Sequence, residues 1–105
     1  MSEEVLKCCF DLLGITVIKK NFKSRADGLV KRENGCWRMG IRAGMPQDKT
    51  VMVMLHELAH MYLHYDKGSI LTLRNTDYEE QADRAAKMAF DLMQIIFKLG
   101  DELEG

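Results

Sequence analysis

The sequence contains little proline and little cysteine. Of its 105 residues one is proline, Pro46, and three are cysteines, of which Cys8 and Cys9 are adjacent. An odd number of cysteines with no CxxC pair fits neither a disulfide framework nor a zinc site built on paired thiolates. We therefore expect buried free thiols in a reducing compartment.

The chain also lacks a long apolar run and an excess of charge of one sign. No apolar stretch approaches membrane-spanning length, and the first residues, MSEE, are acidic where a secretory signal has a basic region. The net charge of -1 gives no general case for nucleic-acid binding. We therefore expect a cytoplasmic protein that binds neither a membrane nor nucleic acid directly.

The length of the chain predicts a single domain over residues 1–105. Residues 1–50 carry ten Lys or Arg and six Asp or Glu, whereas residues 51–105 carry five and ten. We interpret the basic excess in the first half as the solvated side of a sheet.

Residues 1–14 are predicted to form a short amphipathic helix. Ser2 can cap its start and Gly14 can end it. The residues of its expected apolar face recur at helical spacing: Val5, Leu6, Cys9, Leu12 and Leu13.

Residues 15–43 are predicted to form a small sheet of three antiparallel strands. The segments ITVIKK, DGLVKREN and CWRMGIRAG have the composition of strands, and Asn34-Gly35 between the last two is a strong hairpin signal. In the last segment apolar residues alternate with Arg38 and Arg42. This alternation predicts one buried face and one basic face toward water or a ligand.

Two long helices are predicted to follow the sheet. After Pro46 the pattern is helical over residues 47–67, with Gly68 as its stop. A second helix is expected over residues 77–100. Its apolar side comprises Tyr78, Ala82, Ala85, Ala86, Ala89, Met93, Ile96 and Phe97. A helix, a small sheet and two further helices indicate an α+β fold.

The stretch VMVMLHELAHMYLH at 51–64 places three histidines and a glutamate in an apolar helix. Buried ionisable groups need partners, so a helix that serves stability alone has little use for them. At about 100° per residue, His56 and His60 lie on one face, one turn apart, where they can hold one metal ion. Glu57 lies about 60° from His60. From there its carboxylate can take a proton from water, as in HExxH zinc proteases.

The same residues have a purely structural interpretation. In it, His56 and His60 are partly buried and hydrogen-bonded to neighbouring groups, and Glu57 is a surface acid. We favour metal binding, because single helical histidines are common but this triplet on an apolar helix is not. A bound zinc ion can itself be structural or catalytic.

A catalytic zinc ion needs a third protein ligand, and one candidate follows the motif directly. Asp66 lies ten residues after His56, as in proteases with an HExxHxxGxxH or Asp-ended pattern. That pattern requires a glycine for a sharp turn, and this chain has Leu63 at that position.

The other candidate ligands lie at the start of the second long helix, in YEEQADRAAKM. We favour Glu79 over Glu80, with Asp83 one turn later as a hydrogen-bond partner for a ligand histidine. Thr76 and Asp77 each precede one of these glutamates at capping-box spacing. One of the two glutamates can therefore serve only as a cap.

His64 is a further candidate catalytic residue. It lies one turn beyond His60, on the side of Glu57. There it can donate a hydrogen bond to a developing oxyanion or position the substrate. The alternative is a histidine that only ends the helix.

Taken together, DGLV, the hairpin, PQDKTVMVMLHELAHMYLH and YEEQADRAAKMAFDLM resemble the ImmA/IrrE family of zinc-dependent metallopeptidases, over residues 14–93. In that family a helix and a small sheet precede the HExxH helix, and a later helix supplies the third ligand. The resemblance implies a zincin-like minimal domain with His56 and His60 as zinc ligands. It also implies that Glu57 is the general base and Glu79 the third ligand.

The resemblance also implies a substrate, because known members of the family cut helix-turn-helix repressors, often in mobile elements. It predicts a zinc-dependent endopeptidase that cleaves a regulatory protein. The alternative is a zinc-stabilised or inactive module that binds a regulator without cleaving it. Residues 36–43 form the predicted strand nearest in sequence to the HExxH helix, so we expect the substrate to add as a strand beside them.

Overall fold

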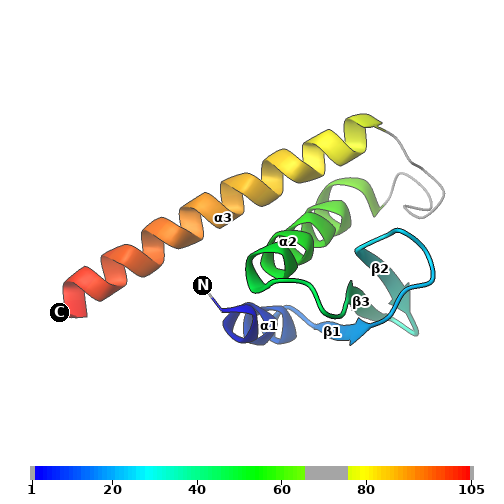
Figure 1. Cartoon of the computed structure of the whole chain (residues 1–105), viewed down its shortest axis with the longest axis horizontal. Coiled ribbons are helices and arrows are strands. Elements are labelled where there is room, and N and C mark those ends of the chain that lie inside the picture. The colour runs from blue at the N-terminus through cyan, green and yellow to red at the C-terminus, as the bar shows by residue number, and fades with distance from the viewer. Residues whose placement is uncertain (1, 66–75, 105) are drawn as a thin grey trace.

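A computed structural model describes residues 2–65 and 76–104 of the chain. Its elements follow in the order α1 (Glu3–Leu12), β1 (Ile15–Lys20), β2 (Gly28–Glu33), β3 (Cys36–Arg42), α2 (Gln47–His64) and α3 (Thr76–Glu104). Figure 1 shows α2 in the middle, with α3 on one side of it and α1 and the sheet on the other. The predicted α+β fold is confirmed.

The sheet is mixed, so the prediction of three antiparallel strands is wrong for β1. The strand order is β1-β3-β2, in which β2 pairs antiparallel with β3 and β1 pairs parallel with it. The segment 21–27 carries the chain from β1 to the far edge of the sheet. β3 therefore becomes the central strand, which suits a strand whose Met39, Gly40 and Ile41 are all buried.

The local signals for turns and caps form as predicted. Asn34 and Gly35 have positive φ angles of 52° and 79°, as the two central residues of a type I′ hairpin turn require. The side-chain oxygen of Ser2 accepts a hydrogen bond from the Val5 N–H at 3.2 Å and caps α1. Each of these features depends on neighbouring residues alone.

The core lies between the sheet, α1 and α2. Its most deeply buried side chains are Leu6, Phe10, Ile15, Met39, Ile41, Val51 and Met54. On α1 only Leu6 and Phe10, one turn apart, are buried. The rest of its predicted apolar face is exposed: Val5, Cys9, Leu12 and Leu13. Because Phe10 is the largest of these side chains, its burial decides which side of α1 turns inward.

The cysteines also differ from the prediction. Cys8, Cys9 and Cys36 are all free and all exposed, so the expectation of buried thiols is wrong. On α1, Cys8 lies opposite Leu6 and Phe10, and Cys9 lies at the flank of the buried side, about 60° from Leu6.

Helix α3 packs against α2, which is the only described element that its backbone approaches closely. Ala82 and Ala86, 0% and 1% exposed, lie at this contact, and their small side chains let the two helices approach closely. The predicted second helix is confirmed, but it is longer than expected and exposes Ile96 and Phe97. Within the described residues, no helix has both the length and the apolar character needed to cross a membrane.

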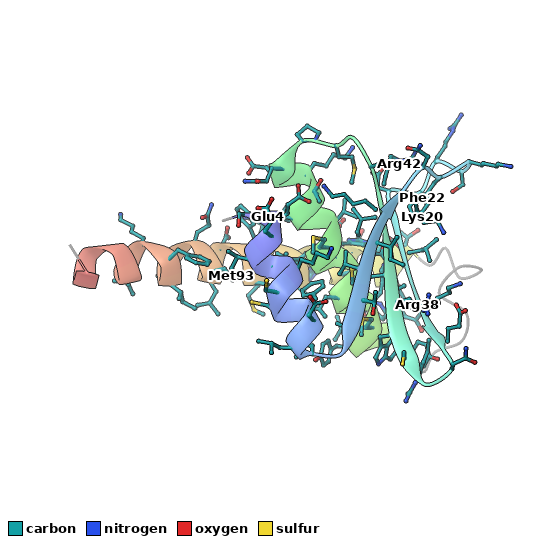
Figure 2. All side chains as sticks on the ribbon, turned by 90° about the horizontal axis from the view of Figure 1, so that it is seen from below. Glu4, Lys20, Phe22, Arg38, Arg42 and Met93 are labelled. Atoms are coloured by element: carbon teal, nitrogen blue, oxygen red, sulfur yellow. The ribbon has the colours of Figure 1, made fainter. Side chains whose placement is uncertain are left out.

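The outer face of the sheet is basic. Lys20 and Arg38 point away from the helices (Figure 2), and Lys31 lies opposite Arg38 in the strand register. All three side chains are exposed. This face accounts for the basic excess in the first half of the sequence.

Arg42 ends β3 and turns toward the segment 21–27. Its guanidinium donates hydrogen bonds to the carbonyl oxygens of Phe22, Ser24 and Ala26 and to the carboxylate of Asp27. It also lies 5.6 Å from the centre of the Phe22 ring, and both residues appear at the same end of the sheet in Figure 2. Arg42 therefore fixes the segment that leads into β2.

We expect Arg42→Gln to loosen the segment 21–27 while the sheet stays folded. The substitution removes a charge-assisted bond and several bonds to carbonyl oxygens, which should lower the free energy of unfolding by about 1–3 kcal/mol. Hydrogen exchange of the amides of residues 21–27 should accelerate, while β3 remains protected. Arg38→Gln, on the exposed outer face, is the matched control. Unchanged exchange in the Arg42→Gln variant would show that this arginine does not hold the segment.

Candidate metal centre

Three side chains from two helices converge between α2 and α3. His56 Nε2 lies 2.9 Å from Glu79 Oε2, and His60 Nε2 lies 3.1 Å from Glu79 Oε1. The two Nε2 atoms are 3.0 Å apart. The ligand atoms all lie within 4.8 Å of one another, and the described residues contain no second group of this kind.

The other ring nitrogen of His56 is held by α3. His56 Nδ1 lies 2.8 Å from Asp83 Oδ1, so the predicted hydrogen bond between Asp83 and a ligand histidine is confirmed. A carboxylate oxygen accepts, so His56 Nδ1 carries the hydrogen. Its Nε2 faces His60 and the Glu79 carboxylate, so it offers a lone pair there when a metal ion takes the place of the hydrogen that Glu79 would otherwise accept.

His60 is held by a chain of two hydrogen bonds that ends on α3. Its Nδ1 lies 2.9 Å from His64 Nδ1, and His64 Nε2 lies 2.8 Å from Gln81 Oε1. The amide oxygen of Gln81 accepts, so His64 Nε2 donates and the Nδ1 of neutral His64 is an acceptor. His60 Nδ1 must then donate, which leaves the lone pair of His60 Nε2 facing His56 and Glu79. Both Nε2 atoms therefore point to one place.

This arrangement fits a zinc ion. Two lone pairs and a carboxylate this close together repel one another unless a cation or a proton lies between them. Two imidazole nitrogens and a carboxylate oxygen are a ligand set of catalytic zinc, and bonds of about 2.0–2.1 Å in a tetrahedron place ligand atoms about 3.3 Å apart. Burial lowers the pKa of His60 more than the charge of Glu79 raises it. His60 is thereby kept in the neutral form that binds a metal.

His64 lies behind His60 and does not line the cavity beside the metal centre. It is 2% exposed, and its ring stacks on Tyr78 with the ring centres 4.3 Å apart. Its donor N–H points to Gln81. These contacts are those of a residue that positions His60. Gln81 is not among the predicted site residues, although its spacing of three residues from Tyr78 places both on one side of α3.

Glu57 lines an open cavity of about 460 Å³ that His56, Glu79 and Asp83 also line. The residue is only 7% exposed, so the interpretation of Glu57 as a surface acid is wrong. Burial raises its pKa to about 7, partly opposed by His56 and assisted by the charge of Glu79. A carboxyl group with a pKa near neutrality can both accept and release a proton.

Gly28 brings β2 against the side chain of Glu57. A Cβ atom at this position would lie 2.9 Å from Glu57 Cγ and 2.8 Å from Val53 Cγ1, too close for real contacts. The strand therefore forms a wall of the cavity because its first residue has no side chain. In the sequence Gly28 stands out only as part of DGLV, because no local pattern reveals that it faces α2.

The other candidate third ligands lie elsewhere. Glu80 is exposed and does not belong to the converging group. Asp66 lies outside the described residues.

We expect His64→Phe to weaken zinc binding by roughly 10–100-fold, the usual effect of removing a hydrogen-bond partner from a ligand histidine. Phenylalanine keeps an aromatic ring against Tyr78 but cannot accept from His60 Nδ1. Zinc affinity is measured by competition with a chromophoric chelator.

Tyr62→Phe is the matched control, because Tyr62 lies on the same helix and is 71% exposed. Its zinc affinity should equal that of the parent. If His64→Phe retained full affinity but lost hydrolysis, His64 would act on the substrate and not through His60.

Comparison with known families agrees with this site. The family described as the IrrE N-terminal-like domain, Peptidase_M78, matches residues 10–93, which include His56, Glu57, His60 and Glu79. Comparison with curated proteins and with solved structures gives no match. The resemblance to the ImmA/IrrE family is thus confirmed over most of the chain. This protein belongs to the IrrE N-terminal-like domain family of peptidases.

Proposed function

We propose that this chain is a zinc-dependent endopeptidase that cleaves a specific regulatory protein. The observation that carries the proposal is the meeting of His56, His60 and Glu79 beside a cavity lined by the buried Glu57. A zinc ion held by these residues would supply a Lewis acid that polarises a peptide carbonyl and acidifies water.

Glu57 carries the proton in the proposed reaction. Its carboxylate accepts a proton from the attacking water and delivers it to the leaving amide nitrogen. Both transfers are possible for one group because burial keeps its pKa near neutrality. The close approach of Gly28 leaves this side chain little room to move.

The substrate would extend the sheet along the edge of β2 that pairs with no other described strand. We predicted residues 36–43 for this role, but β3 is the central strand and is paired on both sides, so that prediction is wrong. β2 is an edge strand, and its first residue, Gly28, lines the cavity. A peptide paired with β2 through main-chain hydrogen bonds can therefore pass beside Glu57.

The choice of a helix-turn-helix repressor as substrate rests on the resemblance to the ImmA/IrrE family. A cavity of about 460 Å³ has the size of a small-molecule pocket and holds only a few side chains at a time. This favours one short extended segment over general digestion. A repressor would be met in the cytoplasm, where three exposed thiols also remain reduced.

We expect the chain to bind one zinc ion. Glu79→Ala should weaken zinc binding by more than roughly 10–100-fold, which is the usual effect of removing only a hydrogen-bond partner of a ligand. Glu80→Ala is the matched control, because it removes the neighbouring carboxylate and should leave affinity unchanged. Metal content is measured by elemental analysis after dialysis against zinc. Equal losses in both variants, or a loss in Asp66→Ala alone, would overturn Glu79 as the third ligand.

We expect Glu57→Gln to retain zinc but to lose hydrolysis by roughly 100-fold or more, because an amide keeps the shape but cannot accept a proton. The zinc-loaded chain is mixed with a repressor encoded beside it and, separately, with casein. Fragments are mapped by mass spectrometry. The parent should cut the repressor at one or a few bonds and leave casein largely intact.

Two results would overturn parts of this proposal. Equal digestion of casein and the repressor would remove the specificity. Tight binding of the repressor without cleavage, unchanged by Glu57→Gln, would show that the chain is a zinc-stabilised binding module and not an enzyme.

A further inference from the structure

Helix α3 carries a second apolar face that does not pack on α2. The face toward the core contains Ala82, Ala86, Phe90 and Met93. The second face, here named the α3 stripe, consists of Met88, Leu92, Ile95 and Leu99, which are 67%, 53%, 55% and 51% exposed. At about 100° per residue, these four side chains fall within about 60° of one another, and their mean direction is about 145° from that of the core face.

The spacing of the α3 stripe is that of a coiled-coil seam. Its residues follow one another at intervals of four, three and four, as the a and d positions of a heptad do. α3 has 29 residues and α2 has 18, so the far half of α3 continues past its neighbour. Figure 1 shows this projection, and Figure 2 shows Met93 near the point where α3 leaves the body.

The α3 stripe is continuous with an apolar groove between the helices. Leu58, Tyr62 and Leu63 of α2 line this groove, of about 190 Å³, together with Ala85 and Ala89 of α3. None of these residues lines the cavity of the metal centre. A helix lying along the stripe would therefore leave the metal centre open.

The charges beside the α3 stripe are complementary in one orientation. Asp91 and Lys98 both occupy the g position, which flanks the seam on one side. In an antiparallel pair of identical helices with Leu92 opposite the partner's Ile95, Met88 meets the partner's Leu99. Asp91 then lies beside the partner's Lys98, and two-fold symmetry forms the same pair twice. In a parallel pair Asp91 would instead face the e residue five positions along the partner, Ile96, which carries no charge.

We propose that the α3 stripe binds a second copy of this chain as an antiparallel helix pair. The stripe supplies the apolar seam, and the Asp91–Lys98 pairs set the orientation. Within the monomer Asp91 pairs with Lys87, one turn away, at 2.9 Å, an exposed contact that a cross-helix pair can replace. This inference does not depend on the proposed peptidase activity.

The first test is the mass of the zinc-loaded full chain in sedimentation equilibrium, over a micromolar to submillimolar range. We expect a transition from 12.1 kDa to twice that mass. Leu92→Glu places two charges in the seam and should raise the dissociation constant at least about a hundred-fold. Gln94→Ala, on the exposed polar face of the same turn, is the control and should leave the dissociation constant unchanged, because it adds no charge beside Asp91 or Lys98. Circular dichroism and zinc content confirm that both variants are folded.

The second test reverses the flanking charges. Asp91→Lys and Lys98→Asp should each weaken the dimer several-fold, because each sets like charges against one another twice. The double variant should recover the parent dissociation constant. A monomer at all concentrations would overturn the proposal, as would a dimer that survives Leu92→Glu. A dimer that the double variant does not recover would overturn the antiparallel register.

Discussion

The close contact between α2 and α3 is the constraint on which the rest of this structure depends. It is made by side chains that are little more than a methyl group, those of Ala82 and Ala86. Because the helices approach closely there, a carboxylate on α3 can reach two imidazoles on α2. The metal centre therefore belongs to the contact itself, and any bulkier residue at these positions would separate its ligands.

The same contact supplies the outer hydrogen bonds that orient the ligands. On one side of Ala82, Asp83 holds His56, and on the other side Gln81 holds His64, which holds His60. These bonds orient both rings so that their Nε2 atoms already face Glu79 before a metal binds. Preorganisation of this kind reduces the conformational freedom lost when a metal binds.

Glu57 shows how burial creates chemistry in a small domain. The carboxyl group is 7% exposed, and this burial raises its pKa because the charged form loses its water. The charge of His56 partly opposes that rise. Gly28 contributes to this burial because its backbone lies against Glu57, where the side chain of any other residue would clash. The start of β2 and one turn of α2 are thus enough to bury a group that can transfer protons, without a deep cleft.

The sequence by itself determined the features that depend on residues close together along the chain. The pair His56 and His60, the Asn34-Gly35 turn and the existence of each helix follow from local spacing, because helix and turn geometry are set by the nearest few residues. Tertiary structure alone decided which strand is central, why Glu57 is buried, and that Gln81 supports His60. It also decided that the α3 stripe stays exposed, because apolar spacing shows that a helix has such a face but not what covers it. Those outcomes depend on which surfaces meet across space, where side-chain volume and burial select among arrangements that the same local pattern permits.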